Sequence, residues 1–404
     1  MKILAVNCGS SSLKFQMYEM PEEKVLISGN FERIGIDNSF YSYKLNGEKI
    51  KKEANLTNHA EAVKILVQEL LDNKIVEDLD EIKGIGHRVV QGADKFDKSV
   101  LVTDEVIKTI DELSPLAPLH NPAALVGINA FMDIVSSAKH VVVFDTAFHQ
   151  TMVKETYLYA LPYELYEKNG IRKYGAHGTS HKYITKTMEE YYKENKKLII
   201  CHIGSGCSIS AVKNGKIVDT SMGFTPNAGV IMGTRTGDMD ASIIPYLIKN
   251  LGYSADDIDH LINKESGFKG ITGGISDSRD IEDGIKEGNE KCILAEKMFV
   301  RSIVNYIARY YVLLDGADAI VFTAGIGENG IDTRMEIMES LKSLGVKADK
   351  DANNCRGKFV KVSADDSNIE CFVVPTDEEV MIAIYTYELV KYNEKNHSFL
   401  YIVI

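Results

Sequence analysis

One pattern that occurs twice constrains the fold more than any other feature. It consists of an apolar run, a short loop of Gly and Ser, and a second run with alternating side chains. In the first copy NCGSSS joins residues 2–6 to residues 13–18. In the second copy GSGCS joins residues 197–203 to residues 209–213, and an NG turn leads on to residues 216–219. Each copy is typical of a β-hairpin, and a unit repeated at this scale indicates a duplicated domain.

Helical and buried strand patterns lie between and after the two hairpins. Residues 60–71, 294–314 and 380–392 carry apolar side chains at helical spacing. The run VVVF at 141–144 is apolar throughout, which is typical of a strand covered on both faces by helices. Residues 319–322 form one more apolar run, which leads into TAGIGENG. The sequence therefore predicts an α/β protein in which each half is mixed.

Bulk composition excludes several classes of function. A chain of 404 residues favours two or three domains, and a net charge of −12 disfavours nucleic acid or an anionic membrane as a partner. There is no signal-peptide pattern and no apolar window near the ~20 residues that a membrane helix needs. The six cysteines contain no CxxC pair, which argues against zinc and disulfides. Reduced thiols fit a cytoplasmic protein.

Three short stretches rich in small residues are candidates for binding phosphate. The chain has no GxxxxGK[ST] motif and no GxGxxG that opens a helix, so P-loop and nicotinamide sites lack support. Residues 9–12, 204–208 and 325–329 instead each follow an apolar run. One such loop is usually a plain turn. Three of them favour nucleotide binding, because backbone N–H groups in such loops can bind phosphate oxygens.

Four basic or imidazole side chains lie in largely apolar surroundings. They are Arg88, His120, His177 and Arg235. For a single arginine of this kind an internal salt bridge is an equal alternative, since a buried charge needs a partner. Two arginines with two histidines look like an anion clamp, and phosphoryl transfer depends on such neutralising groups.

A series of motifs makes the resemblance specific. In order, the chain carries VNCGSSSLKF, GHRVVQG, APLHNPA, VFDTAFH, YGAHGTSH, HIGSGCS, IMGTRTGDMD, TAGIGEN and PTDEE. Together they resemble the acetate kinase family, of the acetate and sugar kinase/actin/Hsp70 superfamily, from residue 1 to about residue 390. GHRVV and APLHNPA are far more specific than the glycine loops.

The resemblance implies a duplicated actin-like (ribonuclease H-like) two-domain α/β fold, with mixed sheets flanked by helices. The expected domains are residues 1–147 plus 384–404, which include a C-terminal helix, and residues 148–383, which bind the nucleotide. The implied activity is Mg²⁺-dependent, reversible transfer of the ATP γ-phosphoryl group to acetate, giving acetyl phosphate and ADP. Mn²⁺ is an alternative metal, propionate a second acceptor, and the family is homodimeric.

The resemblance also implies a role for individual residues. Asn7 and Glu378, or Glu379 beside it, match the Mg²⁺ site. Arg88 and Arg235 match the arginines that hold the carboxylate and the moving phosphoryl group, His177 the histidine that stabilises the transition state, and Asp145 an essential acid. The substrate-binding group is Arg88, His120, Val90, Leu119 and Pro226, the last three forming a pocket for the acyl methyl. The ATP-binding group is Ser10, Ser12, Lys14, His202, Ile203, Gly204, Ser205, Gly206, Asp277, Ser278, Arg279, Gly325, Ile326, Gly327, Glu328 and Asn329. Because the residues fall in both halves, we expect the active site in a cleft between two domains.

The role of Asp145 does not follow directly from the chemistry. Carboxyl groups titrate near ~4, so acetate is ionised at pH 7 and needs no general base. Asp145 is therefore expected to orient Arg88 or Arg235, or to act as an outer-shell Mg²⁺ ligand.

Three positions depart from the family pattern. Ser205 replaces an Asn in the nucleotide loop, Ala176 replaces a Phe that closes the acyl pocket, and Gln91 stands where His is usual. None removes a charged catalytic group. Ala176 predicts a wider pocket and easier use of propionate.

Two other functions stay open from the sequence. A sugar kinase of the same superfamily would use a carboxylate as general base, and Asp145 could serve. However, a neutral sugar gives two arginines nothing to neutralise. A non-enzymatic actin-like ATP switch would leave Arg88, His120, His177 and Arg235 without a role.

Overall fold

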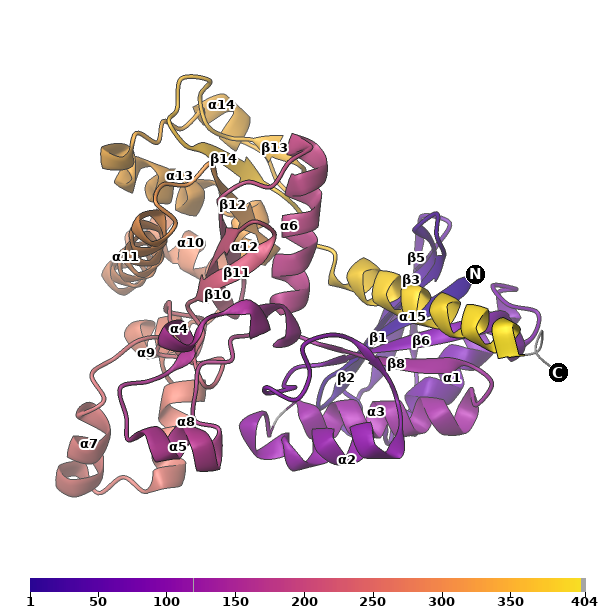
Figure 1. Ribbon diagram of the computed structural model, residues 1–404. Helices are drawn as coiled ribbons and strands as arrows, with labels where there is room; N and C mark the ends of the chain where they lie inside the picture. The colour runs from indigo at the N-terminus through magenta and orange to yellow at the C-terminus, as the bar shows by residue number, and fades with distance from the viewer. Residues whose placement is uncertain (119, 401–404) are drawn as a thin grey trace. The chain divides into compact units, whose positions relative to one another are not determined.

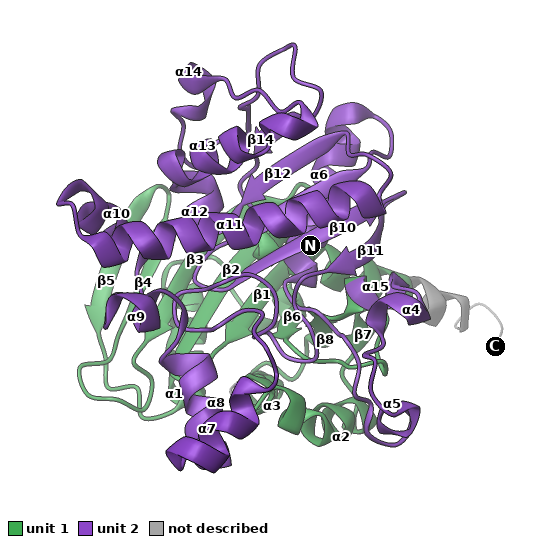
Figure 2. Cartoon of the chain, turned by 90° about the vertical axis from the view of Figure 1, so that its left-hand side faces the viewer, with its two compact units in different colours: residues 1–148, 377–404 green, residues 149–376 purple. Residues whose placement is uncertain are grey.

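The computed structural model describes residues 1–118 and 120–400, with side chains described up to residue 393. Its contacts divide the chain into two compact units, one of residues 1–148 with the segment from Asp377 onward, the other of residues 149–376 (Figure 2). The first unit therefore consists of two stretches that are far apart in the sequence. The expected domain limits after residues 147 and 383 stay a prediction about separable domains.

The first unit is built on an eight-stranded mixed sheet with the order β5-β4-β3-β2-β1-β6-β8-β7. Strands β1 to β5 pair antiparallel in sequence, whereas β1, β6 and β8 run parallel. The strands are β1 Lys2–Cys8, β2 Ser12–Glu19, β3 Lys24–Glu32, β4 Phe40–Leu45, β5 Glu48–Glu53, β6 Ile82–Val89, β7 Val100–Leu101 and β8 Lys139–Phe144. The predicted first hairpin and the buried strand at 141–144 are both confirmed.

Helices cover both faces of this sheet. Helices α1 and α3 pack over one face, where the core includes Leu4, Phe15 and Leu66. Helix α15 lies along β1 and β6 on the other face (Figure 1). The helices are α1 His59–Asp72, α2 Asp104–Glu112, α3 Asn121–Ile134 and α15 Glu378–Leu400.

Two glycines of β6 explain how closely α15 approaches the sheet. A Cβ atom on Gly86 would lie 2.2 Å from Thr386 Oγ1, and one on Gly84 would lie 2.8 Å from Thr386 Cγ2. Any larger residue would push the helix away. This packing brings the first turn of α15, with Glu378 and Glu379, close to the end of β6 that carries Arg88.

The second unit repeats the plan with a six-stranded mixed sheet of order β11-β10-β9-β12-β14-β13. Its strands are β9 Leu198–Ile203, β10 Cys207–Lys213, β11 Lys216–Thr220, β12 Ala319–Thr323, β13 Val360–Lys361 and β14 Glu370–Val373. Its helices are α4 Lys154–Tyr157, α5 Tyr163–Asn169, α6 Gly178–Tyr192, α7 Ile243–Leu251, α8 Ala255–Lys264, α9 Gly267–Thr272, α10 Ser278–Lys286, α11 Glu290–Leu313, α12 Ala324–Asn329, α13 Ile331–Ser340 and α14 Lys350–Asn353. The core lies largely between the sheet and α11, and includes Ile209, Phe299 and Phe322.

Six strands of the first sheet, β3-β2-β1-β6-β8-β7, correspond in order to the six strands of the second. In each, an antiparallel hairpin (β1–β2, β9–β10) continues into a third strand, and its first strand pairs parallel with a strand from much later in the chain (β6, β12). A second parallel strand and a short antiparallel edge strand complete both sheets. The predicted duplicated α/β fold with mixed sheets is confirmed.

Two further expectations concern the cysteines and membrane-spanning helices. All six cysteines are free thiols, and all but Cys355 are buried. None of the helices in the described part of the chain is both long and apolar enough to cross a membrane.

Candidate active site

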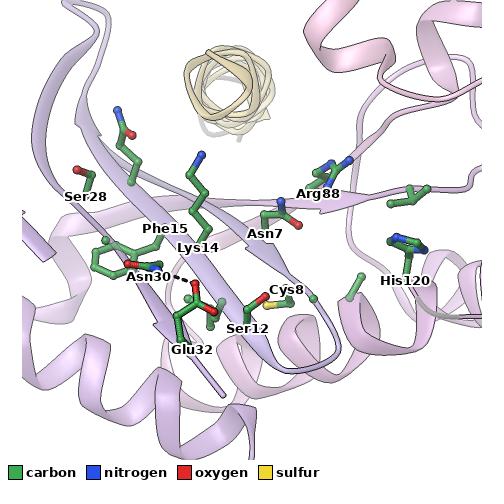
Figure 3. A pocket seen from close by; sticks show the side chains of 16 residues that line it. Asn7, Cys8, Ser12, Lys14, Phe15, Ser28, Asn30, Glu32, Arg88 and His120 are labelled. Atoms are coloured by element: carbon green, nitrogen blue, oxygen red, sulfur yellow. Dashed lines mark hydrogen bonds between the residues drawn. The ribbon is translucent and has the colours of Figure 1, made fainter. Parts of the chain in front are cut away.

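A cavity of about 570 Å³ in the first unit opens over the hairpin of β1 and β2 (Figure 3). The hairpin loop is tight, with Gly9 N donating to Ser12 O at 2.9 Å. Six residues predicted from the sequence line the cavity: Asn7, Ser12, Lys14, Arg88, Val90 and His120. Ser10 is exposed at the loop tip and does not line it. Leu119 lies outside the described residues.

Arg88 is held by the carboxylate of Asp145. The Nη2 atom donates to Asp145 Oδ2 at 2.6 Å, and Nε lies 3.2 Å from both carboxylate oxygens. Asp145 is fully buried at the end of β8. Burial alone would lower the pKa of Arg88, but the attraction of Asp145 and Glu378 outweighs it and raises that pKa. The charge and direction of the guanidinium are therefore both fixed.

Two carboxylates at the start of α15 reach the same region. Glu378 Oε2 lies 3.8 Å from Arg88 Nε, and Glu379 Oε1 accepts from Lys14 Nζ at 2.6 Å. Burial raises the pKa of Glu378 to about 7, against the opposing effect of Arg88. Glu379 is thus occupied by a lysine, whereas Glu378 is a half-buried carboxylate for which a further cation would be favourable.

The donor chemistry near Glu378 suits Mg²⁺ bound together with substrate phosphates. Among the described residues, no group of three or more His, Cys, Asp or Glu side chains is arranged to hold a metal ion. Mg²⁺ is commonly bound by one or two carboxylates, with substrate phosphates and waters as the other ligands. The amide oxygen of Asn7 and the carboxylate of Glu378 are oxygen donors of this kind.

In the second unit, His177 and Arg235 converge on Gly206. A Cβ on Gly206 would lie 3.4 Å from His177 Nε2 and 3.5 Å from Arg235 Nη1, so glycine leaves room for both side chains. His177 stacks on His202, with ring centroids 4.0 Å apart. Arg235 Nη1 donates to the carbonyl of Pro226 at 2.9 Å. Among the described residues Arg235 forms no ion pair, and burial lowers its pKa.

A second cavity, of about 440 Å³, brings together the three predicted nucleotide segments. Gly204 and Ser205, the whole of Asp277–Arg279, and Gly325, Ile326 and Asn329 line it. The loops approach closely, since a Cβ on Gly204 would lie 3.9 Å from Gly325 N. Segments that are distant in sequence therefore form one concave surface.

Five of the predicted nucleotide-binding residues in the second unit do not line this cavity. Ile203 is fully buried in the core, and His202 and Gly206 adjoin His177. Gly327 accepts through its carbonyl from Arg334 Nη1 at 3.0 Å. Glu328 Oε1 accepts from Ala324 N at 2.9 Å and Thr376 N at 3.1 Å. These contacts hold the loops in place.

The third glycine segment was expected to be a loop, and that expectation is wrong. The chain turns at Ala324, at φ +64°, and Ala324–Asn329 forms helix α12. The side chain of Glu328 satisfies the N–H of Ala324 at the helix start. A helix start presents N–H groups as a phosphate loop does, but a helix this short carries no sequence period.

The three departures have different structural settings. Ser205 is exposed and lines the second cavity. Gln91 is buried, and its Oε1 accepts from Ala93 N at 2.8 Å, so it stabilises the turn after β6. Ala176 is buried in the second unit's core, in the same apolar cluster as Met222 and Met232. Its side chain lines neither cavity.

Both cavities include residues that sequence reasoning missed. Ser28, Asn30 and Glu32 of β3 line the first cavity because they face the same way as the β2 residues they pair with, for example Lys14 with Asn30. Their period-two spacing was a usable signal. The second cavity adds Gly233 of the IMGTRTGDMD motif and Ser276, next to the predicted segment Asp277–Arg279. It also adds Phe268, Glu282 and Arg356, which belong to no motif named from the sequence.

Known proteins share this architecture over nearly the whole chain. The model of the acetokinase family matches residues 2–384. An acetate kinase from Bacillus subtilis (strain 168) is 52% identical over 385 residues, which cover 95% of this chain and 98% of the relative.

Two solved structures share the fold of this chain. A Porphyromonas gingivalis acetate kinase is 43% identical with a TM-score of 0.91, and the match covers 96% of this chain and 99% of that one. A propionate kinase from Francisella tularensis subsp. tularensis SCHU S4 is 40% identical with the same TM-score and the same two coverages. The chain belongs to the acetokinase family.

Proposed function

We propose that this enzyme transfers the γ-phosphoryl group of ATP reversibly to acetate, giving acetyl phosphate and ADP. The observation that carries the proposal is the contrast between its two arginines. Arg88 is fixed by Asp145, whereas Arg235 has no carboxylate partner among the described residues. One guanidinium is rigidly aimed, and the other is ready to neutralise an incoming anion. An anionic acceptor and an anionic phosphoryl group require both.

The proposed roles follow from the two settings. Arg88 binds the acceptor carboxylate, next to Val90 and His120 in the first cavity. Arg235 and His177 stabilise charge on the transferred phosphoryl group through hydrogen bonds that strengthen in the transition state. Arg88 belongs to the first unit, whereas Arg235 and His177 belong to the second.

The nucleotide is proposed to bind at the second cavity. Backbone N–H groups near Gly204 and Gly325 suit phosphates, and the mixed walls that include Phe268 and Ile326 suit a base and ribose. Ser10, Ser12 and Lys14 act on the terminal phosphates from the hairpin of the first unit.

Mg²⁺ is the proposed metal, held by Asn7 and Glu378, with Mn²⁺ as a substitute. When bound, the ion neutralises phosphate charge. The buried position of Glu378 supports this, because a nearby cation would offset the burial that raises its pKa. Glu379, the alternative, is already paired with Lys14.

The contacts of Asp145 weigh against a sugar kinase. A general base must be free to accept a proton from a hydroxyl, but Asp145 accepts from both Nε and Nη2 of Arg88. A non-enzymatic ATP switch would leave the fixed position of Arg88 unexplained. The geometry therefore favours a carboxylate acceptor.

Propionate is proposed as a second acceptor. The observation that supports it is the propionate kinase among the similar structures. We also propose a homodimeric enzyme, as the family resemblance implies. A cytoplasmic location is proposed in line with the absence of CxxC pairs and the free thiols.

One assay separates these functions. The purified protein is incubated with ATP and Mg²⁺ plus acetate, propionate, glycerol or glucose, and acyl phosphate is trapped with hydroxylamine while ADP is measured separately. We expect hydroxamate with acetate and propionate, and loss of activity in EDTA that Mg²⁺ restores. ADP release that responds to glucose or glycerol but not to acetate would contradict the proposal.

A further inference from the structure

Two histidines at the start of α6 share one serine hydroxyl of β10. Ser208 Oγ lies 3.0 Å from His177 Nδ1 and 2.7 Å from His181 Nε2. The histidines are one helical turn apart, and His181 N donates to His177 O at 2.9 Å. Both imidazoles therefore reach the same atom from the same helix face. Ser208 and His181 are both fully buried.

The shared hydroxyl cannot treat the two rings alike. Serine carries one hydrogen to donate and two lone pairs to accept with. It can donate to one imidazole nitrogen only, and the other nitrogen must then donate to it. The direction of these two hydrogen bonds depends on which imidazole donates its proton to Ser208 Oγ.

The surroundings of His181 set that direction. Burial lowers its pKa well below the usual value, with His149 and His202 adding to the effect, so the ring is neutral and carries one proton. Its Nδ1 is buried and has no hydrogen-bond partner among the described residues. A proton there would be a buried N–H without an acceptor, and such groups are rare in proteins. On Nε2 the same proton forms the 2.7 Å bond to Ser208.

We propose that His181 and Ser208 are positioning residues that fix the tautomer of His177. His181 donates from Nε2 to Ser208 Oγ, Ser208 donates its hydrogen to His177 Nδ1, and neutral His177 therefore carries its own proton on Nε2.

This tautomer has a direct use at the site. The Nε2 edge of His177 adjoins Gly206, which Arg235 Nη1 also approaches, whereas the opposite edge faces Ser208. Oxygens of a phosphoryl group only accept hydrogen bonds, so Nε2 must donate to stabilise them. The relay supplies this donor before the substrate binds and without rearrangement during the reaction.

Further contacts hold the ring of His177 in its plane. His177 has φ +62° at the cap of α6, and its ring stacks on His202 at an interplanar angle of 21°. His202 is itself held by Ser180 Oγ, 2.8 Å from Nδ1. The relay therefore has to set only the proton, because stacking sets the orientation.

The use of His177 in catalysis rests on the proposed function, but its tautomer does not, so the two can fail separately. Long-range ¹H–¹⁵N spectra of the full-length protein with labelled histidine distinguish a protonated ring nitrogen from a bare one. His177→Gln and His181→Gln variants assign the two rings. We expect Nε2 protonated and Nδ1 bare in both. A proton on Nδ1 of either neutral ring overturns the proposal, whatever the enzyme catalyses.

Variants test the consequence for turnover. Ser208→Ala should leave His177 as a mixture of tautomers and lower kcat by up to about 100-fold, with little change in KM for ATP. His181→Gln keeps an amide donor and should retain more activity than His181→Phe. The matched control is Ser210→Ala, which removes a buried hydroxyl of the same strand bonded to Thr220 at 2.9 Å. Equal kcat in the two serine variants, or an unchanged His177 spectrum in Ser208→Ala, would show that His181 and Ser208 do not fix the tautomer of His177.

Discussion

Arg88 donates to the buried carboxylate of Asp145 through both Nε and Nη2, with the Nη2–Oδ2 contact at 2.6 Å. This geometry makes Asp145 an orienting group, because its oxygens already accept from the guanidinium. We predict that Asp145→Asn lowers kcat on the order of 10²-fold, as expected when one electrostatic stabiliser is misplaced. The pH dependence of kcat should keep its shape in the variant. If Asp145 were a general base, the limb assigned to its deprotonation would disappear.

Arg235 gives the sharpest test of transition-state stabilisation. Arg235→Ala should lower kcat by about 10²–10³-fold, and Arg235→Lys should restore only part of it, because lysine lacks the planar fork. Steady-state kinetics with both substrates measure the effect. The exposed Arg301 of α11 provides a charge-matched control, and Arg301→Ala should leave kcat and the KM values for both substrates unchanged. A rise in KM for ATP with kcat intact would assign Arg235 to ground-state binding instead.

Ala176→Phe should narrow the acceptor preference toward acetate. Pocket discrimination per methylene is typically ~1–3 kcal/mol, so we expect the acetate-to-propionate ratio of kcat/KM to rise by about tenfold or more. KM for ATP should not change. Ala176 shares its cluster with Met222 and Met232, and flexible methionines can refill space. An unchanged ratio would show that they already do so and that position 176 does not set pocket size.

Ser205→Asn should strengthen nucleotide binding. Ser205 lines the second cavity, and asparagine adds an amide that can donate directly where the shorter serine relies on a bridging water. One further hydrogen bond contributes about 0.5–1.5 kcal/mol, so the Kd for ADP measured by calorimetry should fall roughly 2- to 10-fold. A Kd that stays the same or rises would mean that the amide does not reach the phosphates.

Glu296 of α11 should make the protein less stable as pH rises. Burial raises its pKa from 4.5 to about 7, although Thr333 Oγ1 donates to it at 2.6 Å. The unfolded chain loses this proton near pH 4.5 and the native state only near pH 7, so the native state binds more protons between them and stability falls across that window. The full effect is about 3 kcal/mol.

The amide of the Glu296→Gln variant does not titrate, so the variant lacks this dependence of stability on pH. Denaturant unfolding at pH 5 and pH 8 should show that the free energy of unfolding of the variant increases relative to that of wild type as pH rises. Glu339→Gln, at an exposed position, is the control and should follow wild type. Parallel wild-type and Glu296→Gln curves would mean that the carboxyl is ionised throughout.

Local patterns predicted the elements of the fold and many of the candidate residues. Period-two alternation marks the β1–β2 and β9–β10 hairpins, and helical spacing marks α1, α11 and α15. Contacts between distant segments produce no such local pattern in the sequence. The sequence left open whether Asp145 would face Arg88 or Arg235, since only the parallel pairing of β6 with β8 places it beside Arg88. The bond between His181 and Ser208 joins a helix to a strand, and no single stretch of sequence records it.

The close fit of α15 against Gly84 and Gly86 has a consequence for biosynthesis. The sheet on which α15 packs is translated before the second unit, yet the helix that covers it is translated only after the entire second unit. At about 5–20 residues per second, the ribosome needs roughly 10 to 45 seconds to make residues 149–376. During that interval the nascent sheet exposes its glycine-lined face, so the first unit is completed only after α15 leaves the exit tunnel. A nascent chain halted before α15 offers that uncovered face to chaperones.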